Sequence, residues 1–146
     1  MRTIRNARNL LLGCGLAALL AATAHAEGVK VIVNSGNRTS SLGRDKVVQI
    51  FLKKETSFPG GQAAIPVDQV EAAPVRREFS KLVLARDASA VVTYWNQMIF
   101  SGRATPPKQM SSDDEVLTFI RNNANAIGYV SADKDVGAGI RVVTIN

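Results

Sequence analysis

The chain divides into a leader-like front segment and a remainder that contains neither cysteine nor histidine. Residues 1–26 begin with three spaced arginines, continue with an apolar run and end in Ala24-His25-Ala26. This is the pattern of a secretory signal peptide. The only cysteine, Cys14, and the only histidine, His25, both lie in this segment. Cleavage after Ala26 would leave a domain that must fold by ordinary apolar packing, without a disulfide.

Two other interpretations of the front segment fit the sequence less well. Residues 11–14 (LLGC) resemble a lipobox, but a lipobox ends the apolar run, and this run continues to Ala22. A retained membrane anchor needs ~20 consecutive apolar residues, which is more than the run from Leu10 to Ala22 offers. We therefore expect a cleaved signal peptide and a periplasmic location.

Length and charge indicate one ordinary globular domain. Removing residues 1–26 from the 146 leaves 120, a common size for a domain with one apolar core. Three of the 18 basic residues and none of the 12 acidic ones lie in the front segment. The remaining 15 basic and 12 acidic residues give a net charge of about +3. The basic residues are scattered and not interleaved with aromatic ones, so we predict no nucleic-acid partner and a single domain over 27–146.

Hydrophobic patterning predicts strands mixed with helices. The expected strands are 29–33, 64–67, 126–130 and 140–145. Helices are expected after Thr39-Ser40-Ser41, from Pro74, from Asp87 or Ser89 with an end at Gly102, and after a capping box at 112–115. The order is β-α-β-α-α-α-β-β, which predicts a three-layer α/β domain with a mixed sheet. Tyr94, Trp95 and Met98 are interpreted as core residues.

Five strings between residues 40 and 131 resemble, in order, segments of the periplasmic phosphate-binding proteins, the solute receptors of phosphate ABC importers. The strings are IFLKK (50–54), PVDQ (66–69), RREF (76–79), YWNQMIFSGRATPP (94–107) and AIGYV (126–130). On these strings the chain is identified as a short, single-lobe member of that family. The resemblance implies a single lobe of the type II periplasmic-binding-protein fold.

The chain departs from this family where its members grip phosphate. In the family, a segment rich in arginine, serine, glycine and threonine at a helix start holds the anion. Here residues 68–74 read DQVEAAP, with two acids and no hydroxyl, and Lys53 replaces the glycine of the family's IFLGK string. The resemblance therefore does not imply that this chain binds phosphate for transport with the residues that the family uses.

Three other segments offer donors for an anion. Oxyanion capture uses backbone N–H groups, hydroxyls and guanidinium groups, and a helix start supplies free N–H groups. The first candidate is the run Arg38, Thr39, Ser40 and Ser41 before the first helix. Its alternative interpretation is simple helix capping by Ser40 or Ser41, with Arg38 in solvent.

The second candidate is Arg76 with its neighbour Arg77, near the start of the Pro74 helix. Its alternative interpretation is an exposed helix face on which the arginines pair with Glu71 or Glu78. Gly60-Gly61 is a third and weaker candidate, because a glycine pair without a following lysine or serine indicates only a turn. The acids at 113–115 are explained by the helix start, so no metal site is expected.

These observations favour an exported, non-catalytic solute-binding module for phosphate or another small oxyanion, without a cofactor. The alternative is a single-lobe interaction module that docks on a membrane receptor or transporter without binding solute. The resemblance implies receptors with two lobes that close on the ligand, so a homodimer of this single lobe would rebuild a two-sided cleft. Ser131-Ala132-Asp133-Lys134 fits the S-x-x-K pattern of some hydrolases, but no companion motif is present, so we interpret it as a solvated turn.

Overall fold

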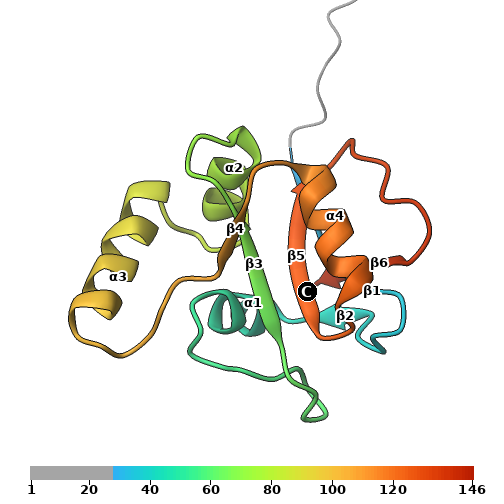
Figure 1. Cartoon of the computed structure of the whole chain (residues 1–146), viewed down its shortest axis with the longest axis horizontal. Coiled ribbons are helices and arrows are strands. Elements are labelled where there is room, and N and C mark those ends of the chain that lie inside the picture. The colour runs from blue at the N-terminus through green and yellow to red at the C-terminus, as the bar shows by residue number, and fades with distance from the viewer. Residues whose placement is uncertain (1–27) are drawn as a thin grey trace, which may run out of the picture.

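The structure is a computed structural model that describes residues 28–146, so the predicted signal peptide lies outside the described residues. Its elements follow the order β1, β2, α1, β3, α2, α3, β4, α4, β5, β6 (Figure 1). The strands are β1 Val29–Asn34, β2 Ser41–Leu42, β3 Ile65–Gln69, β4 Lys108–Met110, β5 Ala126–Ser131 and β6 Ile140–Ile145. The helices are α1 Arg44–Phe51, α2 Pro74–Leu82, α3 Ala88–Phe100 and α4 Asp113–Asn122. The predicted order is confirmed, except that the two short strands β2 and β4 were missed.

The strands form one mixed sheet in the order β2-β6-β1-β5-β3-β4. β1 is antiparallel to its neighbours β5 and β6, whereas β2 is parallel to β6 and β3 is parallel to both β4 and β5. Five strands therefore run in one direction and β1 runs in the other. We call the side of the sheet at which these five strands start the amino edge, and the side at which they end the carboxyl edge. Neither term refers to the outer strands β2 and β4.

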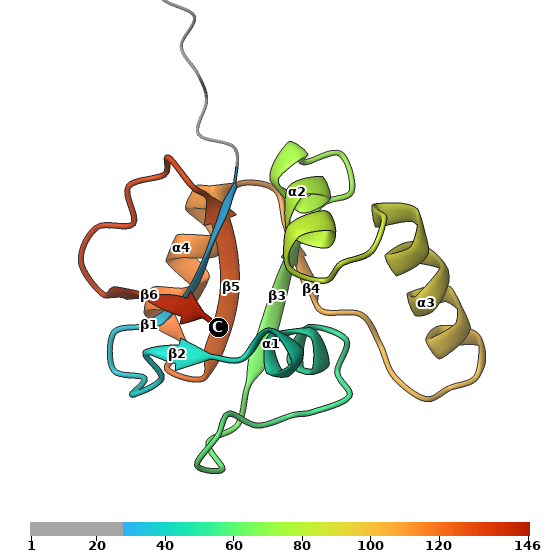
Figure 2. The ribbon, with the colours of Figure 1, turned by 180° about the vertical axis from the view of Figure 1, so that it is seen from behind.

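Helices cover both faces of this sheet, which confirms the predicted three layers. Figure 1 shows α4 on one face, and Figure 2 shows α1 and α2 on the other. Each face has its own cluster of buried apolar side chains. In β1, Val31 and Val33 join the cluster under α1 and α2, and Ile32 joins the cluster under α4, because successive side chains of a strand point to opposite faces. A strand segment covered on both faces is apolar without alternation, as the buried centre of β1 from Val31 to Val33 is.

Gly128 of β5 lets α4 lie close to the sheet. A Cβ atom built on this glycine would lie 2.9 Å from Val116 Cγ1 on α4 and 2.9 Å from Val67 Cγ2 on β3. Real carbon atoms do not approach so closely, so any side chain here would push α4 outward. Glycine is therefore required by packing at this position.

Most predicted helix ends are confirmed. Pro74 is the first residue of α2, and Gly102 follows α3 with a φ of +66°. The Ser112 hydroxyl accepts a hydrogen bond from the Glu115 amide at 3.2 Å, and the Glu115 carboxylate accepts one from the Ser111 amide at 2.7 Å. This is a capping box whose return bond is shifted by one residue.

The predicted start of the first helix is wrong. α1 begins at Arg44 after Gly43, and no side chain caps it. Ser41 and Leu42 instead pair with Thr144 and Ile145 of β6 as strand β2. Because this pairing holds them extended, the hydroxyls of residues 39–41 do not cap the helix.

The helix α3 lies at the periphery. It packs against α2 and stands beside the rest of the molecule in both views (Figures 1 and 2). Its contact side includes Trp95, which is buried, and Tyr94, whose hydroxyl donates to the Leu52 carbonyl at 2.8 Å. The interpretation as core is confirmed for Trp95, whereas Tyr94 and Met98 are half-buried and pack against the same apolar cluster. Among the described helices, none is both long and apolar enough to cross a bilayer.

Candidate oxyanion site

A cavity of about 420 Å³ opens at the amino edge of the sheet, where the loops before β2 and β3 meet. We call it the amino-edge pocket. The residues that line it are Asn37, Arg38, Thr39, Ser40, Ser41, Pro59, Gly60 and Gln62. The first candidate segment, residues 38–41, is thus brought together with the third, Gly60. Because β2 and β3 run in the same direction and both segments precede their strands, the two segments lie at the same end of the sheet.

The lining of this pocket is rich in hydrogen-bond donors. It contains one guanidinium group, three hydroxyl groups and two carboxamides, and no carboxylate. Gly60 and Gly61 have φ angles of +98° and +90°, which glycine adopts without strain. The glycine pair therefore forms the tight turn that brings Gln62 beside residues 38–41. Such a lining favours a small anion over a cation.

Asn37 is the most unusual residue of the pocket. It is only 1% exposed, and its Oδ1 accepts a hydrogen bond from the Thr39 amide at 2.9 Å. That bond fixes the orientation of the carboxamide, because a flipped amide would place two donors against each other. The Nδ2 donor is buried and has no partner among the described residues. Buried donors in folded proteins are almost always paired with protein groups, ordered water or a ligand, so this donor is available to an acceptor that enters the pocket.

Sequence reasoning missed Asn37 and Gln62. Asn37 belongs to the run Asn34-Ser35-Gly36-Asn37, whose composition is typical of a turn and predicts no ligand contact. Only the fold shows that this side chain is buried, because burial depends on distant segments that pack over it. The prediction that a helix start adds free N–H groups to residues 38–41 is wrong, since α1 begins at Arg44.

Arg76 lies apart from this pocket, at the carboxyl edge of the sheet. It is 4% exposed, and its Nη2 lies 3.4 Å from Asp68 Oδ2. The alternative interpretation, an exposed arginine that pairs with Glu71 or Glu78, is therefore wrong for Arg76, whereas Arg77 is exposed. The reason is that β3 extends to Gln69 and buries Asp68 beneath α2. The Glu78 carboxylate instead accepts a hydrogen bond from the Gly28 amide at 3.0 Å.

Polar side chains at the carboxyl edge already bind one another. Gln69 Nε2 donates to Asp113 Oδ1 at 2.7 Å, and the other oxygen of Asp113 accepts from the Ser131 amide at 3.2 Å. Asp113 thus links the ends of β3 and β5 to the start of α4, besides lying in the first turn of that helix. Within residues 28–146, no three metal-ligating side chains gather into a site that could hold a metal ion.

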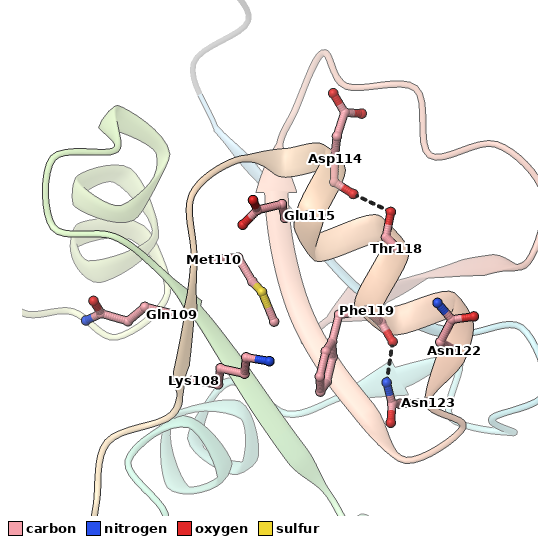
Figure 3. A pocket seen from close by; sticks show the side chains of 9 residues that line it. All are labelled: Lys108, Gln109, Met110, Asp114, Glu115, Thr118, Phe119, Asn122 and Asn123. Carbon is pink, nitrogen blue, oxygen red and sulfur yellow. Dashed lines mark hydrogen bonds between the residues drawn. The ribbon is translucent and has the colours of Figure 1, made fainter.

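A larger cavity of about 530 Å³ lies between β4 and α4 (Figure 3). Met110 and Phe119 form its apolar floor, and the Lys108 ammonium lies 5.5 Å from the centre of the Phe119 ring. Its two carboxylates are already used: Glu115 in the capping box, and Asp114 in an ion pair with Lys134 at 2.7 Å. The two acids make this groove a poor place for an anion.

The S-x-x-K string forms the expected turn. The Lys134 amide donates to the Ser131 carbonyl at 3.0 Å, and its half-buried side chain pairs with Asp114. The hydrogen bond that the Lys134 ammonium donates to the Asp114 carboxylate raises the pKa of Lys134 above its usual value. A lysine that holds its proton more firmly than usual is unsuited to act as a base on Ser131.

Several solved structures share this fold. An ABC-type phosphate transport receptor from Vibrio cholerae aligns with a TM-score of 0.63 and 17% identity over 81% of this chain and 46% of its own. A putative phosphate ABC transporter substrate-binding protein with bound phosphate from Clostridium perfringens gives 0.60 and 18% over 81% and 44%. PstS from Borrelia burgdorferi gives 0.60 and 12% over 82% and 47%. No protein-family model and no curated protein matches the chain.

These similarities establish the fold, which is that of the periplasmic binding proteins, as the sequence resemblance implied. At 12–18% identity they establish neither the ligand nor the function of this chain. The chain spans less than half the length of the solved structures it matches.

Proposed function

We propose that this chain is an exported, non-catalytic solute-binding module that takes a small oxyanion, with phosphate as the first ligand to test. The unpaired Nδ2 of Asn37 carries this proposal, because it is a buried donor in a pocket lined by donors and free of carboxylates. Phosphate is bound by one of the solved structures that share the fold. The signal-peptide pattern of residues 1–26 supports export to the periplasm, where an importer or receptor would be the partner.

The energetics favour binding of modest strength. Leaving a buried donor unpaired costs about 1–3 kcal/mol, and an oxyanion that accepts its hydrogen bond would recover that free energy. The Arg38 guanidinium adds a charge-assisted contact from an exposed position. An anion bound in a pocket open to solvent stays partly hydrated, so we expect a dissociation constant on the order of 1 mM, or about −4 kcal/mol.

The test is isothermal titration of the purified protein with phosphate, with sulfate as the comparison anion. Asn37→Asp keeps the oxygen that accepts from Thr39 and replaces the free donor with a negative oxygen. We expect this substitution to weaken binding at least about tenfold, equivalent to about 1.4 kcal/mol. Arg38→Ala should weaken it as well.

Arg103→Ala is the matched control, because it removes the same charge from an exposed arginine outside the pocket. It should leave the affinity unchanged. Unchanged affinity in Asn37→Asp, or no saturable binding by the folded wild-type protein, would refute the proposed site.

A second candidate function is docking on a membrane receptor or transporter without solute binding. The end of α3 favours it, because Phe100 is 90% exposed and the adjacent Ile99 is 51% exposed. Large apolar side chains that cluster on a surface often mark a protein contact. A protein that binds no anion but adsorbs saturably to membranes from its source cell, and loses this in Phe100→Ser, would favour docking over solute binding.

A further inference from the structure

Three donors converge on the carboxylate of Asp68 at the carboxyl edge of the sheet. The Tyr129 hydroxyl donates to Oδ1, and the Gln69 amide donates to the same oxygen at 2.8 Å. The Arg76 guanidinium lies 3.4 Å from Oδ2. All four residues are at least nine-tenths buried. The carboxylate is therefore surrounded by a hydroxyl, a backbone amide and a cation inside the protein.

This arrangement has the composition of a site for a small carboxylate. Guanidinium, amide and hydroxyl donors are the groups that proteins use to hold anions. The site also lies at the carboxyl edge of the parallel strands, where open α/β sheets bind their ligands. In this chain, however, the anion is a side chain of β3 itself.

We propose that Asp68 is an internal ligand that occupies and closes an anion site formed by Arg76, Tyr129 and the Gln69 amide. While Asp68 is present, Arg76 is neutralised and takes no part in solute binding. Removing the carboxylate opens a site that accepts formate or acetate, the small anions that reproduce its two oxygens. This site is separate from the amino-edge pocket and does not depend on the proposed function.

Electrostatic attraction to Arg76 would drive an external anion into this site. Breaking a buried ion pair by removing one partner leaves an uncompensated buried charge, which strongly destabilises the fold. In Asp68→Ala that charge is the Arg76 guanidinium, next to the space left by the carboxylate. An external anion that enters this space restores the pair, so it stabilises the folded state by mass action.

Thermal unfolding of the full chain with formate, against chloride at the same ionic strength, tests the proposal. Formate should raise the melting temperature of Asp68→Ala, by about 5 °C at ten times its dissociation constant and further with the logarithm of its concentration above that. The wild-type protein should show no such difference between the two salts. If Asp68→Ala does not fold in chloride, the yield of folded protein after refolding in formate replaces the melting temperature as the readout.

Two control variants make the result specific. Asp68→Asn fills the same space with a neutral group, and Asp68→Ala combined with Arg76→Met removes the buried charge. Neither should respond to formate beyond the wild-type protein. An equal response in the double variant, or no response in Asp68→Ala by either readout, would overturn the proposal. Phosphate binding at the amino-edge pocket should persist in the double variant, so the two proposals can fail separately.

Discussion

At the scale of single residues, the buried hydroxyl of Tyr129 is held in its neutral form. Burial raises the pKa of Tyr129 well above its usual range, and the neighbouring Asp68 carboxylate raises it further. The ring also stacks on Phe79, with centroids 3.8 Å apart. Tyr129 therefore joins the apolar core under α2 to the polar cluster at the carboxyl edge.

This environment predicts how stability depends on alkaline pH. A group whose pKa is raised in the folded state contributes stability that is fully present below its unfolded pKa, about 10 for tyrosine, and is lost as the pH rises above it. The chain has two tyrosines, so Tyr94→Phe leaves Tyr129 as the only one. In that variant, tyrosinate absorbance should appear only together with unfolding, as followed by circular dichroism. Absorbance that rises while the protein remains folded would contradict the buried hydrogen bond to Asp68.

At the scale of elements, the ends of the helices show which local signals decide structure. The Ser112 cap and the Pro74 start depend on residues within one helical turn, and both form as predicted. The start of α1 depends instead on the pairing of β2 with β6, which lies about a hundred residues further along the chain. Hydroxyls before a helix are therefore reliable caps only where no strand competes for the same backbone.

The capping box of α4 gives a matched pair of substitutions. Ser112→Ala removes the hydroxyl that accepts from the Glu115 amide, so we expect a loss of about 1 kcal/mol in the free energy of unfolding. Ser111→Ala is the control, because the capping box uses only the backbone amide of Ser111, and its side chain is exposed. Urea unfolding measures both. Equal effects of the two substitutions would show that the hydroxyl does not cap the helix.

At the scale of the whole molecule, the sheet with its two apolar faces is the stable centre, and α3 is peripheral. β1 pairs on both sides with β5 and β6 and is buried on both faces, whereas α3 packs mainly on α2 and ends in exposed apolar side chains. Elements with few buried contacts open locally at lower free energy than the core.

Hydrogen exchange should resolve this difference. We expect the backbone amides of α3 to exchange at least about tenfold faster than those of β1 and β5, because local opening of α3 exposes less apolar surface than global unfolding. Exchange measured peptide by peptide by mass spectrometry checks this, with α4 as the control helix packed directly on the sheet. Protection of α3 equal to that of β1 would show that α3 belongs to the same cooperative unit.

The sequence by itself determined the order of the main elements, the mixed α/β architecture and most helix ends. These depend on side-chain periodicity and on caps, which act over a few residues and can be read from a single segment. It also located Arg38, Thr39, Ser40 and Ser41 as a group of donors. It did not identify the short strands β2 and β4, whose two or three residues show no periodicity.

Only the tertiary structure decided the environment of each polar residue. It buried Asn37 beside Arg38 with an unpaired donor, and it joined Arg76 to Asp68 inside the protein. Both outcomes follow from contacts between segments that are distant in the sequence, such as the Tyr129 hydroxyl and Asp68, which lie 61 residues apart. Burial and pairing are properties of those contacts. No local pattern could therefore distinguish the exposed Arg38 at the amino edge from the neutralised Arg76 at the carboxyl edge.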